Sequence, residues 1–275
     1  MKHPITYCNG SFVQLNEAGI SLTDLGLQRG YAIFDFLRVV GSTPLFLEDH
    51  LDRFYHSAAL MHLTVKESRE ELRLLIHQMI HANNFEHAGI RILLAGGSSS
   101  DGYTITIPTL ALIQQPLAAP PETFPMEGIA LCSYSFQRQL STVKTTDYLM
   151  AIWLQPWLKE QGGQDILYHQ EGYVTECPRS NIFIVTEEGI LVTPTFNMLK
   201  GVTRKNILSI ALEKGIPTEE RNFHLEEVHQ AREVFITSST KRILPVNKLD
   251  GKDLNSLDAN YPVAKILWDE LLKKE

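Results

Sequence analysis

The chain has 275 residues, of which 44% are hydrophobic and 21% charged, values that are ordinary for a soluble globular protein with room for two domains. Its formal net charge of −7 at pH 7 disfavours nonspecific attraction to nucleic acid or to an anionic membrane. Three well-separated cysteines, Cys8, Cys132 and Cys177, and the lack of a signal peptide or an apolar run of membrane length favour a cytoplasmic protein without disulfides or structural zinc.

The first part of the chain predicts a mixed unit of helices and strands. Asn9-Gly10 is typical of a hairpin turn. Periodicity and β-propensity then predict a strand at residues 33–40, helices at 48–63 and 68–83, and strands at 90–94 and 104–113. Four prolines lie in the stretch that follows, so we expect residues 116–125 to form a linker between a small domain, residues 1–115, and a larger domain, residues 126–275.

Strands dominate the prediction for the second part. Glu171-Gly172 and Glu188-Gly189 read as hairpin turns between neighbouring strands. The predicted strands are residues 129–134, 166–169, 173–176, 181–186, 190–192 and 233–237, and the predicted helices are residues 145–161, 203–214 and 262–273.

Lys144 is the leading candidate for chemistry because it falls just before the helix predicted to begin at residue 145. The positive end of a helix dipole disfavours an ammonium group, and a neutral amine is the form that attacks carbonyl carbons. Taken alone, an exposed lysine without any catalytic role is the better interpretation, since lysine is rarely buried.

Four further segments offer groups that bind anions or hold charge. Arg53 has a planar guanidinium that matches phosphate oxygens, although an ordinary ion pair is the simpler reading. Glu176 follows a predicted strand. It is either a carboxylate held in a fixed position or an ordinary residue at the end of a strand. Gly201 and Thr203 open a predicted helix whose free amides suit an anion, and a capped helix start is about equally consistent. The hydroxyls of residues 238–240 either donate hydrogen bonds to a phosphate or carboxylate or belong to an ordinary loop.

Two other patterns do not match the nucleotide-binding or zinc-binding motifs that they resemble. The glycine-rich residues 95–102 lack the lysine of a phosphate-binding loop and do not match a dinucleotide fingerprint. His77 and His81 lie one helical turn apart but lack the glutamate of a zinc-protease motif. We therefore expect no metal site.

Taken in order, Arg53, Lys144, Glu176 and residues 199–204 and 238–240 resemble the class IV, fold type IV pyridoxal-phosphate enzymes. That family includes branched-chain aminotransferases, D-amino-acid aminotransferases and aminodeoxychorismate lyases. The resemblance covers nearly the whole chain and is most specific at residues 48–54, 174–183 and 201–204. It implies an α+β fold with a small N-terminal α/β sandwich and a larger, strand-rich C-terminal pseudobarrel that binds pyridoxal 5′-phosphate.

The resemblance also implies roles for individual residues. Lys144 would hold the cofactor covalently and move the proton of the substrate Cα, while Glu176 would keep the pyridine nitrogen protonated. Leu199 would pack on the ring, and Tyr148 resembles a tyrosine that bonds the cofactor's phenolic oxygen, although its spacing from the lysine is one residue shorter than in branched-chain enzymes. The groups expected around the phosphate are Arg53, Val202, Thr203 and Ser239.

No subfamily pattern is complete in the expected substrate pocket. The arginine and histidine of D-amino-acid aminotransferases are missing from residues 96–100, and Gly89 replaces the tyrosine that branched-chain enzymes place two residues before the arginine matched by Arg91. Residues 97–103 look most like the lyases, but Asp35 and Phe36 occupy the neighbourhood of the lyase threonine. The residues expected to line the pocket are Phe34, Phe36, Arg38, Arg91 and Thr240.

Three functions therefore compete. The first is a transaminase that moves an amino group between an amino acid, such as a branched-chain one, and a 2-oxo acid. The second is a lyase that eliminates pyruvate from aminodeoxychorismate to give 4-aminobenzoate. The third is a catalytically silent homologue that keeps only the fold. The resemblance further implies a homodimer in which residues 96–103 of the partner contribute to the active site.

Overall fold

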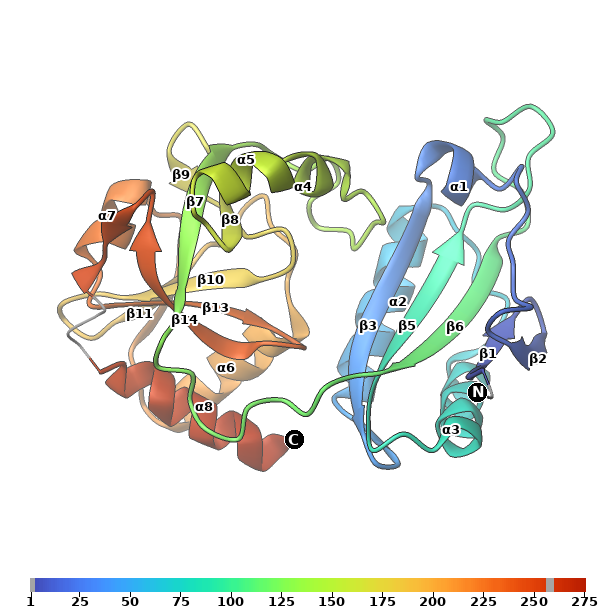
Figure 1. Ribbon diagram of the computed structural model, residues 1–275, viewed down its shortest axis with the longest axis horizontal. Helices are drawn as coiled ribbons and strands as arrows, with labels where there is room; N and C mark the ends of the chain where they lie inside the picture. The colour runs from blue at the N-terminus through green and yellow to red at the C-terminus, as the bar shows by residue number, and fades with distance from the viewer. Residues whose placement is uncertain (1–2, 256–259) are drawn as a thin grey trace. The chain divides into compact units, whose positions relative to one another are not determined.

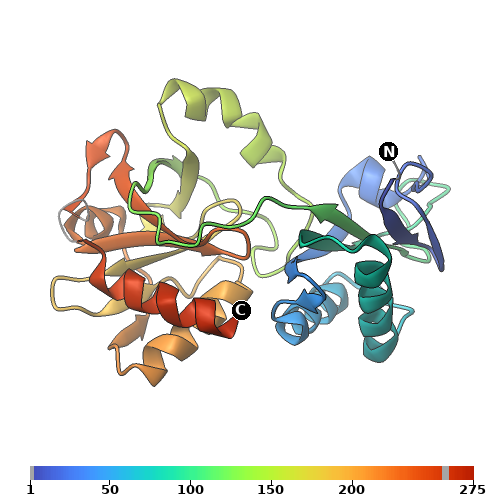
Figure 2. The same cartoon turned by 60° about the horizontal axis from the view of Figure 1, so that its bottom comes forward.

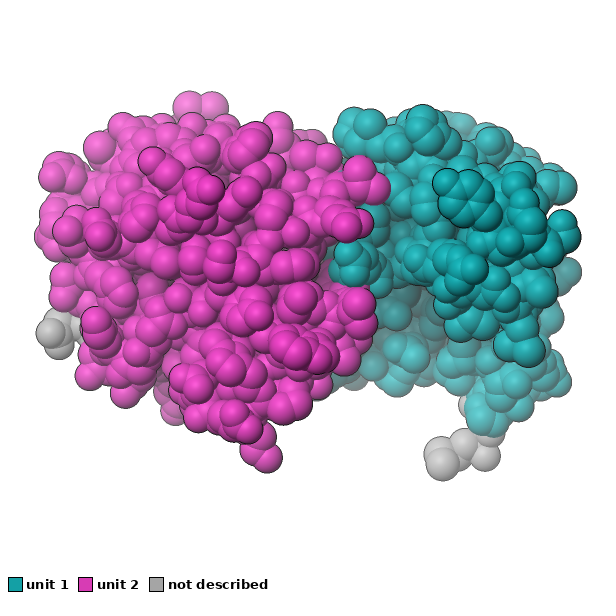
Figure 3. All heavy atoms as spheres, turned by 90° about the horizontal axis from the view of Figure 1, so that it is seen from above, with its two compact units in different colours: residues 1–119, 143–147 teal, residues 120–142, 148–275 magenta. Residues whose placement is uncertain are grey.

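The computed structural model describes residues 3–255 and 260–275 and divides the chain into two compact units, coloured separately in Figure 3. The first unit contains residues 1–119 and 143–147, and the second contains residues 120–142 and 148–275. The short segment around Lys144 therefore belongs to the first unit although it follows residues 120–142 in sequence.

The first unit is an antiparallel six-stranded sheet with the order β2-β1-β6-β5-β3-β4. Figures 1 and 2 show that α2 and α3 cover the same face of this sheet. Its strands are β1 (Ile5–Cys8), β2 (Ser11–Gln14), β3 (Ala32–Val40), β4 (Thr43–Pro44), β5 (His87–Ala95) and β6 (Thr109–Pro116), and its helices are α1 (Leu25–Arg29), α2 (Leu47–Leu60) and α3 (Arg69–Asn83).

The alternation of side chains along β3 decides what each face of this sheet carries. Ile33, Asp35 and Leu37 are all completely buried and belong to the face covered by the helices, where Ile33 and Leu37 join the core. Phe34 and Phe36 alternate with them and point to the opposite face. A charged residue, Asp35, therefore stands among the apolar residues of the core face.

The second unit is built on a nine-stranded sheet with the order β12-β11-β10-β13-β14-β7-β8-β9, and β15 pairs with β14. Its strands are β7 (Ile129–Ser135), β8 (Asp165–Gln170), β9 (Tyr173–Val174), β10 (Asn181–Val185), β11 (Leu191–Thr193), β12 (Thr218–Glu220), β13 (Glu233–Ser238), β14 (Arg242–Leu249) and β15 (Lys252–Asp253). Its helices are α4 (Leu149–Trp153), α5 (Gln155–Glu160), α6 (Val202–Glu213), α7 (Leu225–Gln230) and α8 (Pro262–Lys274).

The mixed α+β architecture and the strand-rich second part are confirmed. Asn9-Gly10 and Glu171-Gly172 are two-residue hairpin turns with positive φ at both positions, as their sequences predict. The third predicted turn, at Glu188-Gly189, connects the antiparallel strands β10 and β11. Within the described residues, no helix has the length and apolarity needed to cross a membrane.

Two predicted elements differ most in extent from the structure. The strand predicted from residue 104 begins at Thr109, because Asp101 accepts hydrogen bonds from the amides of Tyr103 and Thr104 and closes that stretch into a loop. The helix predicted over 145–161 is absent over 145–148 and broken between α4 and α5, where Pro156 occupies the first turn of α5.

Candidate functional site

Lys144 lies in an extended segment paired with β3, and not at the start of a helix. The Phe34 amide donates to the carbonyl of Lys144 at 3.0 Å, and the Thr146 amide donates to the carbonyl of Ala32 at 3.0 Å. On its other side the Lys144 amide donates to Ser57 Oγ of α2 at 3.4 Å. The expected effect of a helix dipole on Lys144 is therefore wrong, because α4 begins only at Leu149.

The ring of Phe34 brings two predicted site residues together. Lys144 Nζ lies 4.6 Å from the ring centroid of Phe34, and Arg91 Cζ lies 5.3 Å from it. Both distances are within the range of a cation–π contact, in which the negative face of the ring attracts a cation. The side chain of Lys144 is thus held over the sheet face that Phe34 and Arg91 share.

Phe36 fills the space that Gly89 leaves on the neighbouring strand. A β-carbon added to Gly89 would collide with ring atoms of Phe36 and would also press on Leu117. Gly89 pairs with Arg38, and Phe36 pairs with Arg91, in the register of β3 and β5. The missing tyrosine at position 89 is therefore matched by an aromatic ring that comes from position 36.

Asp35 organises a buried ion-pair cluster between β3 and α2. Its carboxylate accepts from Arg53 Nε and Nη2, both at 2.8 Å, and lies 2.6 Å from His50 Nδ1. Burial acts to raise the pKa of Asp35, but the charges of Arg53 and His50 and their hydrogen bonds outweigh it and hold that pKa well below its usual range. Burial lowers the pKa of His50 despite the neighbouring carboxylate, so the imidazole is neutral and donates from Nδ1.

The neutral, buried His50 predicts a pH-dependent loss of stability. The unfolded chain binds a proton at His50 below about pH 6.5, whereas the folded chain does not until a lower pH. Above about pH 6.5, His50 therefore makes its full contribution to the free energy of unfolding. Below that pH, the contribution falls by up to about 1.4 kcal/mol per pH unit until the lower pKa of the folded state is reached.

The variant His50→Asn keeps a donor for Asp35 but cannot titrate, so its urea midpoint is expected to fall less than that of the parent between pH 7 and pH 5. His56→Asn, an exposed position on the same helix, serves as the matched control and is expected to follow the parent. An equal fall in the parent and in His50→Asn would contradict this account of His50.

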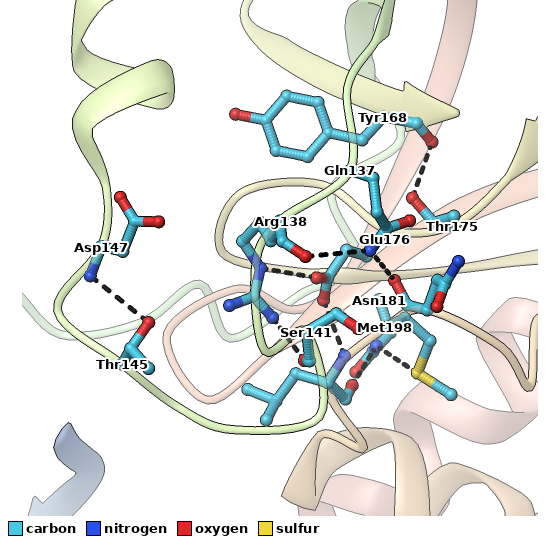
Figure 4. Close-up of polar contacts among 12 residues, drawn as sticks. Gln137, Arg138, Ser141, Thr145, Asp147, Tyr168, Thr175, Glu176, Asn181 and Met198 are labelled. Atoms are coloured by element: carbon cyan, nitrogen blue, oxygen red, sulfur yellow. Dashed lines mark hydrogen bonds and ion pairs between the residues drawn. The ribbon is translucent and has the colours of Figure 1, made fainter. Parts of the chain in front are cut away.

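Glu176 is held as a fixed carboxylate in the second unit (Figure 4). Arg138 Nε donates to its Oε1 at 2.8 Å, and the Leu199 amide donates to its Oε2 at 3.0 Å. Arg138 is itself anchored through Nη2 to the carbonyl of Ser141 at 2.6 Å. The carboxylate is buried, and the positive partner and the amide donor compensate for the water that it loses there.

The turn at residues 199–201 leads from this carboxylate to the start of α6. Gly201 is the N-cap of α6 and has no side chain to bond the amides that follow it. In the part of the chain that the structure describes, no side chain caps the helix, so Val202 and Thr203 open it with N–H groups in the arrangement that attracts anions. Both residues are buried at the first turn, and the Thr203 hydroxyl belongs to the same turn.

Ser239 and Thr240 lie in the turn between β13 and β14. Ser239 is half-buried and Thr240 is exposed. The turn is anchored by the next residue, because Lys241 Nζ contacts Asp165 Oδ2 at 2.7 Å and Ser180 Oγ at 3.1 Å. The hydroxyls predicted from the sequence thus lie on a turn that is held in place by the contact between Lys241 and the buried Asp165.

Tyr148 is half-buried and comes directly before α4.

The candidate residues fall into two groups. One contains Lys144, Phe34, Arg91 and the Arg53 cluster, and the other contains Glu176, Leu199 and the first turn of α6. Sequence reasoning missed the four residues that hold these candidates in place: Asp35, His50, Arg138 and Asn181.

The chain matches one family along most of its length. The model for the family described as "Amino-transferase class IV" matches residues 32–249. A Methanocaldococcus jannaschii protein named "Putative branched-chain-amino-acid aminotransferase" is 30% identical over 261 residues, which cover 91% of this chain and 89% of that protein. The "D-alanine aminotransferase" of Listeria monocytogenes is 28% identical over 252 residues, which cover 88% of this chain and 86% of that protein.

The fold also matches a solved structure over almost its full length. The branched-chain amino acid aminotransferase of Escherichia coli superposes with a TM-score of 0.89 and 25% identity, covering 99% of this chain and 94% of that one. The two-domain architecture implied by the sequence resemblance is therefore confirmed.

Proposed function

The chain belongs to the class IV aminotransferase family, and from this premise we propose the residues and the substrate class with which it carries out transamination that depends on pyridoxal 5′-phosphate. The lyase alternative is not favoured, because the family and the relatives are named as aminotransferases, and the same names argue against a catalytically silent homologue.

The donor groups of this chain fit the cofactor. Pyridoxal 5′-phosphate, when bound, withdraws electrons from the substrate Cα and so makes its proton removable. Lys144 would supply the primary amine that holds the aldehyde carbon and would carry the Cα proton. Glu176 is an acceptor fixed by Arg138, which suits a protonated ring nitrogen. Leu199 would lie against the ring, and Tyr148 would donate to its phenolic oxygen.

The phosphate is assigned to groups with positive charge or free N–H. The amides of Val202 and Thr203 and the Thr203 hydroxyl open α6, and Ser239 adds a hydroxyl. Arg53 already gives its Nε N–H and one N–H of Nη2 to Asp35, so the N–H groups of Nη1 and the second one of Nη2 are those that it would offer to phosphate.

The observation that supports an apolar substrate is the aromatic surface of β3. Phe34 and Phe36 provide the wall, and Arg38, Arg91 and Thr240 provide polar groups for a carboxylate. We propose an amino acid with an apolar side chain, of the branched-chain kind that the archaeal relative is named for, and a 2-oxo acid as acceptor.

A half-reaction screen tests this assignment. Single amino acids of both hands are added to the yellow enzyme without any acceptor, and the visible band of the cofactor is followed. Branched-chain amino acids are expected to bleach the band fastest, with the matching 2-oxo acid as product. Faster bleaching by D-alanine would overturn the substrate class, and formation of 4-aminobenzoate and pyruvate from aminodeoxychorismate would overturn transamination.

We further propose that the enzyme is a homodimer. Leu22, Leu27, Tyr103 and Ile107 are exposed apolar side chains of the first unit, and Tyr103 and Ile107 are 87% and 84% exposed. The Arg29 side chain donates to the carbonyl of Gly102, which ties the loop at residues 96–103 to α1. Apolar side chains gathered this way suit burial by a second copy. Sedimentation equilibrium should give twice the mass of one chain, and a monomer would refute this proposal.

The thiols support the proposal of a cytoplasmic enzyme. Cys8, Cys132 and Cys177 are free, and burial raises the pKa of Cys132 and of Cys177. Free, protonated thiols are stable in a reducing compartment. Fractionation of cells that express the tagged chain tests this location.

A further inference from the structure

Asn181 holds the turn that precedes α6 from both sides. Its Oδ1 accepts from the Gly201 amide at 3.1 Å, and its Nδ2 donates to the carbonyl of Leu199 at 2.7 Å. Asn181 is the first residue of β10 and is buried, so its amide is fixed by the central sheet of the second unit. One side chain thus holds two backbone groups of a three-residue turn.

The same turn is tied to Glu176. Leu199 donates its amide to Glu176 Oε2 at 3.0 Å and gives its carbonyl to Asn181. Glu176 and Asn181 belong to one short stretch of chain, closed by the mutual backbone hydrogen bonds of Cys177 and Ser180. That stretch therefore sets the position of the turn relative to the Glu176 carboxylate.

Gly201 is required here for space and not for an unusual backbone angle. Its φ of −68° and ψ of 145° are open to any residue. A β-carbon at this position, however, would collide with Asn181 Oδ1. Asn181 and Gly201 are complementary in shape, and the free amides of Val202 and Thr203 follow directly.

We propose that Asn181 is a positioning residue, which holds the first amides of α6 at a fixed distance from the Glu176 carboxylate. The inference rests on the proposed function, in which the phosphate binds at α6 and the ring nitrogen at Glu176. The cofactor is compact, and its ring holds the nitrogen and the carbon that bears the phosphate arm at a fixed separation. A rigid turn lets both be bound at once without ordering the turn during binding.

The test compares pyridoxal 5′-phosphate with pyridoxal, which has the same ring and aldehyde but no phosphate. Dissociation constants for both are measured by fluorescence titration of the cofactor-free enzyme, with the melting temperature recorded for each variant. Asn181→Ala is expected to weaken binding of pyridoxal 5′-phosphate by about tenfold or more, the scale known for removing a residue that orients the ligands of a metal site. Binding of pyridoxal is expected to change much less.

Asn197→Gly is the matched control, because Asn197 lies two residues before Leu199, its side chain donates to Gln170 and not to that turn, and glycine tolerates its positive φ of 54°. It is expected to leave the ratio of the two dissociation constants unchanged. An equal loss of both ligands in Asn181→Ala would mean a general structural role and would overturn the inference. A parent enzyme that binds both ligands equally would instead refute the phosphate site itself.

A second pair of variants keeps the inference testable if Asn181→Ala does not fold. Asn181→Ser retains a small polar group and is expected to shift the ratio in the same direction by less. Gly201→Ala alone is expected to weaken pyridoxal 5′-phosphate binding, and the added methyl is expected to cost less when Asn181→Ser is also present. Additive effects of the two changes would show that Asn181 and Gly201 act separately, against the proposal.

Discussion

Replacement of Lys144 by alanine is expected to abolish covalent attachment of pyridoxal 5′-phosphate and to lower the rate of transamination by at least about 10³-fold. The amine of Lys144 is half-buried and held over Phe34, with its backbone fixed by β3 and Ser57. Alanine keeps this backbone but removes the group that holds the aldehyde and moves the Cα proton.

Borohydride reduction followed by peptide mass analysis measures the attachment directly. The parent should carry the reduced cofactor on the peptide that contains Lys144, and the variant should carry none. Lys159→Ala, an exposed lysine on α5, should behave as the parent. Turnover at the parental rate by Lys144→Ala would make the assignment of the active site wrong.

Glu176→Gln is expected to have the second largest effect, a fall of about 10²- to 10³-fold in kcat, the magnitude typical of losing one fixed electrostatic partner. A glutamine has nearly the same shape but no charge for the ring nitrogen. Its amide nitrogen would also face either Arg138 or the Leu199 amide, both of which are donors.

Cofactor content and melting temperature are measured beside kcat, so that loss of folding is separated from loss of chemistry. Glu187→Gln, an exposed acid in the hairpin between β10 and β11, removes the same charge away from the network. If Glu176→Gln retains full kcat with bound cofactor, Glu176 does not serve the ring nitrogen.

The sequence was sufficient for elements whose signals are local. The two-residue turns, the capping box that starts α3 at Ser68 and the alternation of β3 are all written in neighbouring residues. The failure around Lys144 has a tertiary cause. Thr145 and Thr146 have good β-propensity, and they pair with β3, which is far away in sequence, so the apolar spacing beyond them did not begin a helix at 145.

The supporting residues of the site were harder to foresee for the same reason. Arg138 reaches Glu176 across 38 positions of sequence, and nothing in its own surroundings predicts that contact. Asp35 did leave a signal, because an acid at a core position between Ile33 and Leu37 requires a buried partner. That partner is Arg53, for which the sequence indicates an ordinary ion pair beside the phosphate contact but does not identify Asp35 as its partner.

The packing of Phe36 over Gly89 restricts the order in which this chain can acquire new specificities. A larger residue at position 89 meets the Phe36 ring, so substitution at 89 is unfavourable until position 36 has become smaller. Phe36 must be replaced by a smaller residue before Gly89 can be replaced by a larger one. Libraries that vary both codons together should yield active variants that saturation of position 89 alone cannot reach.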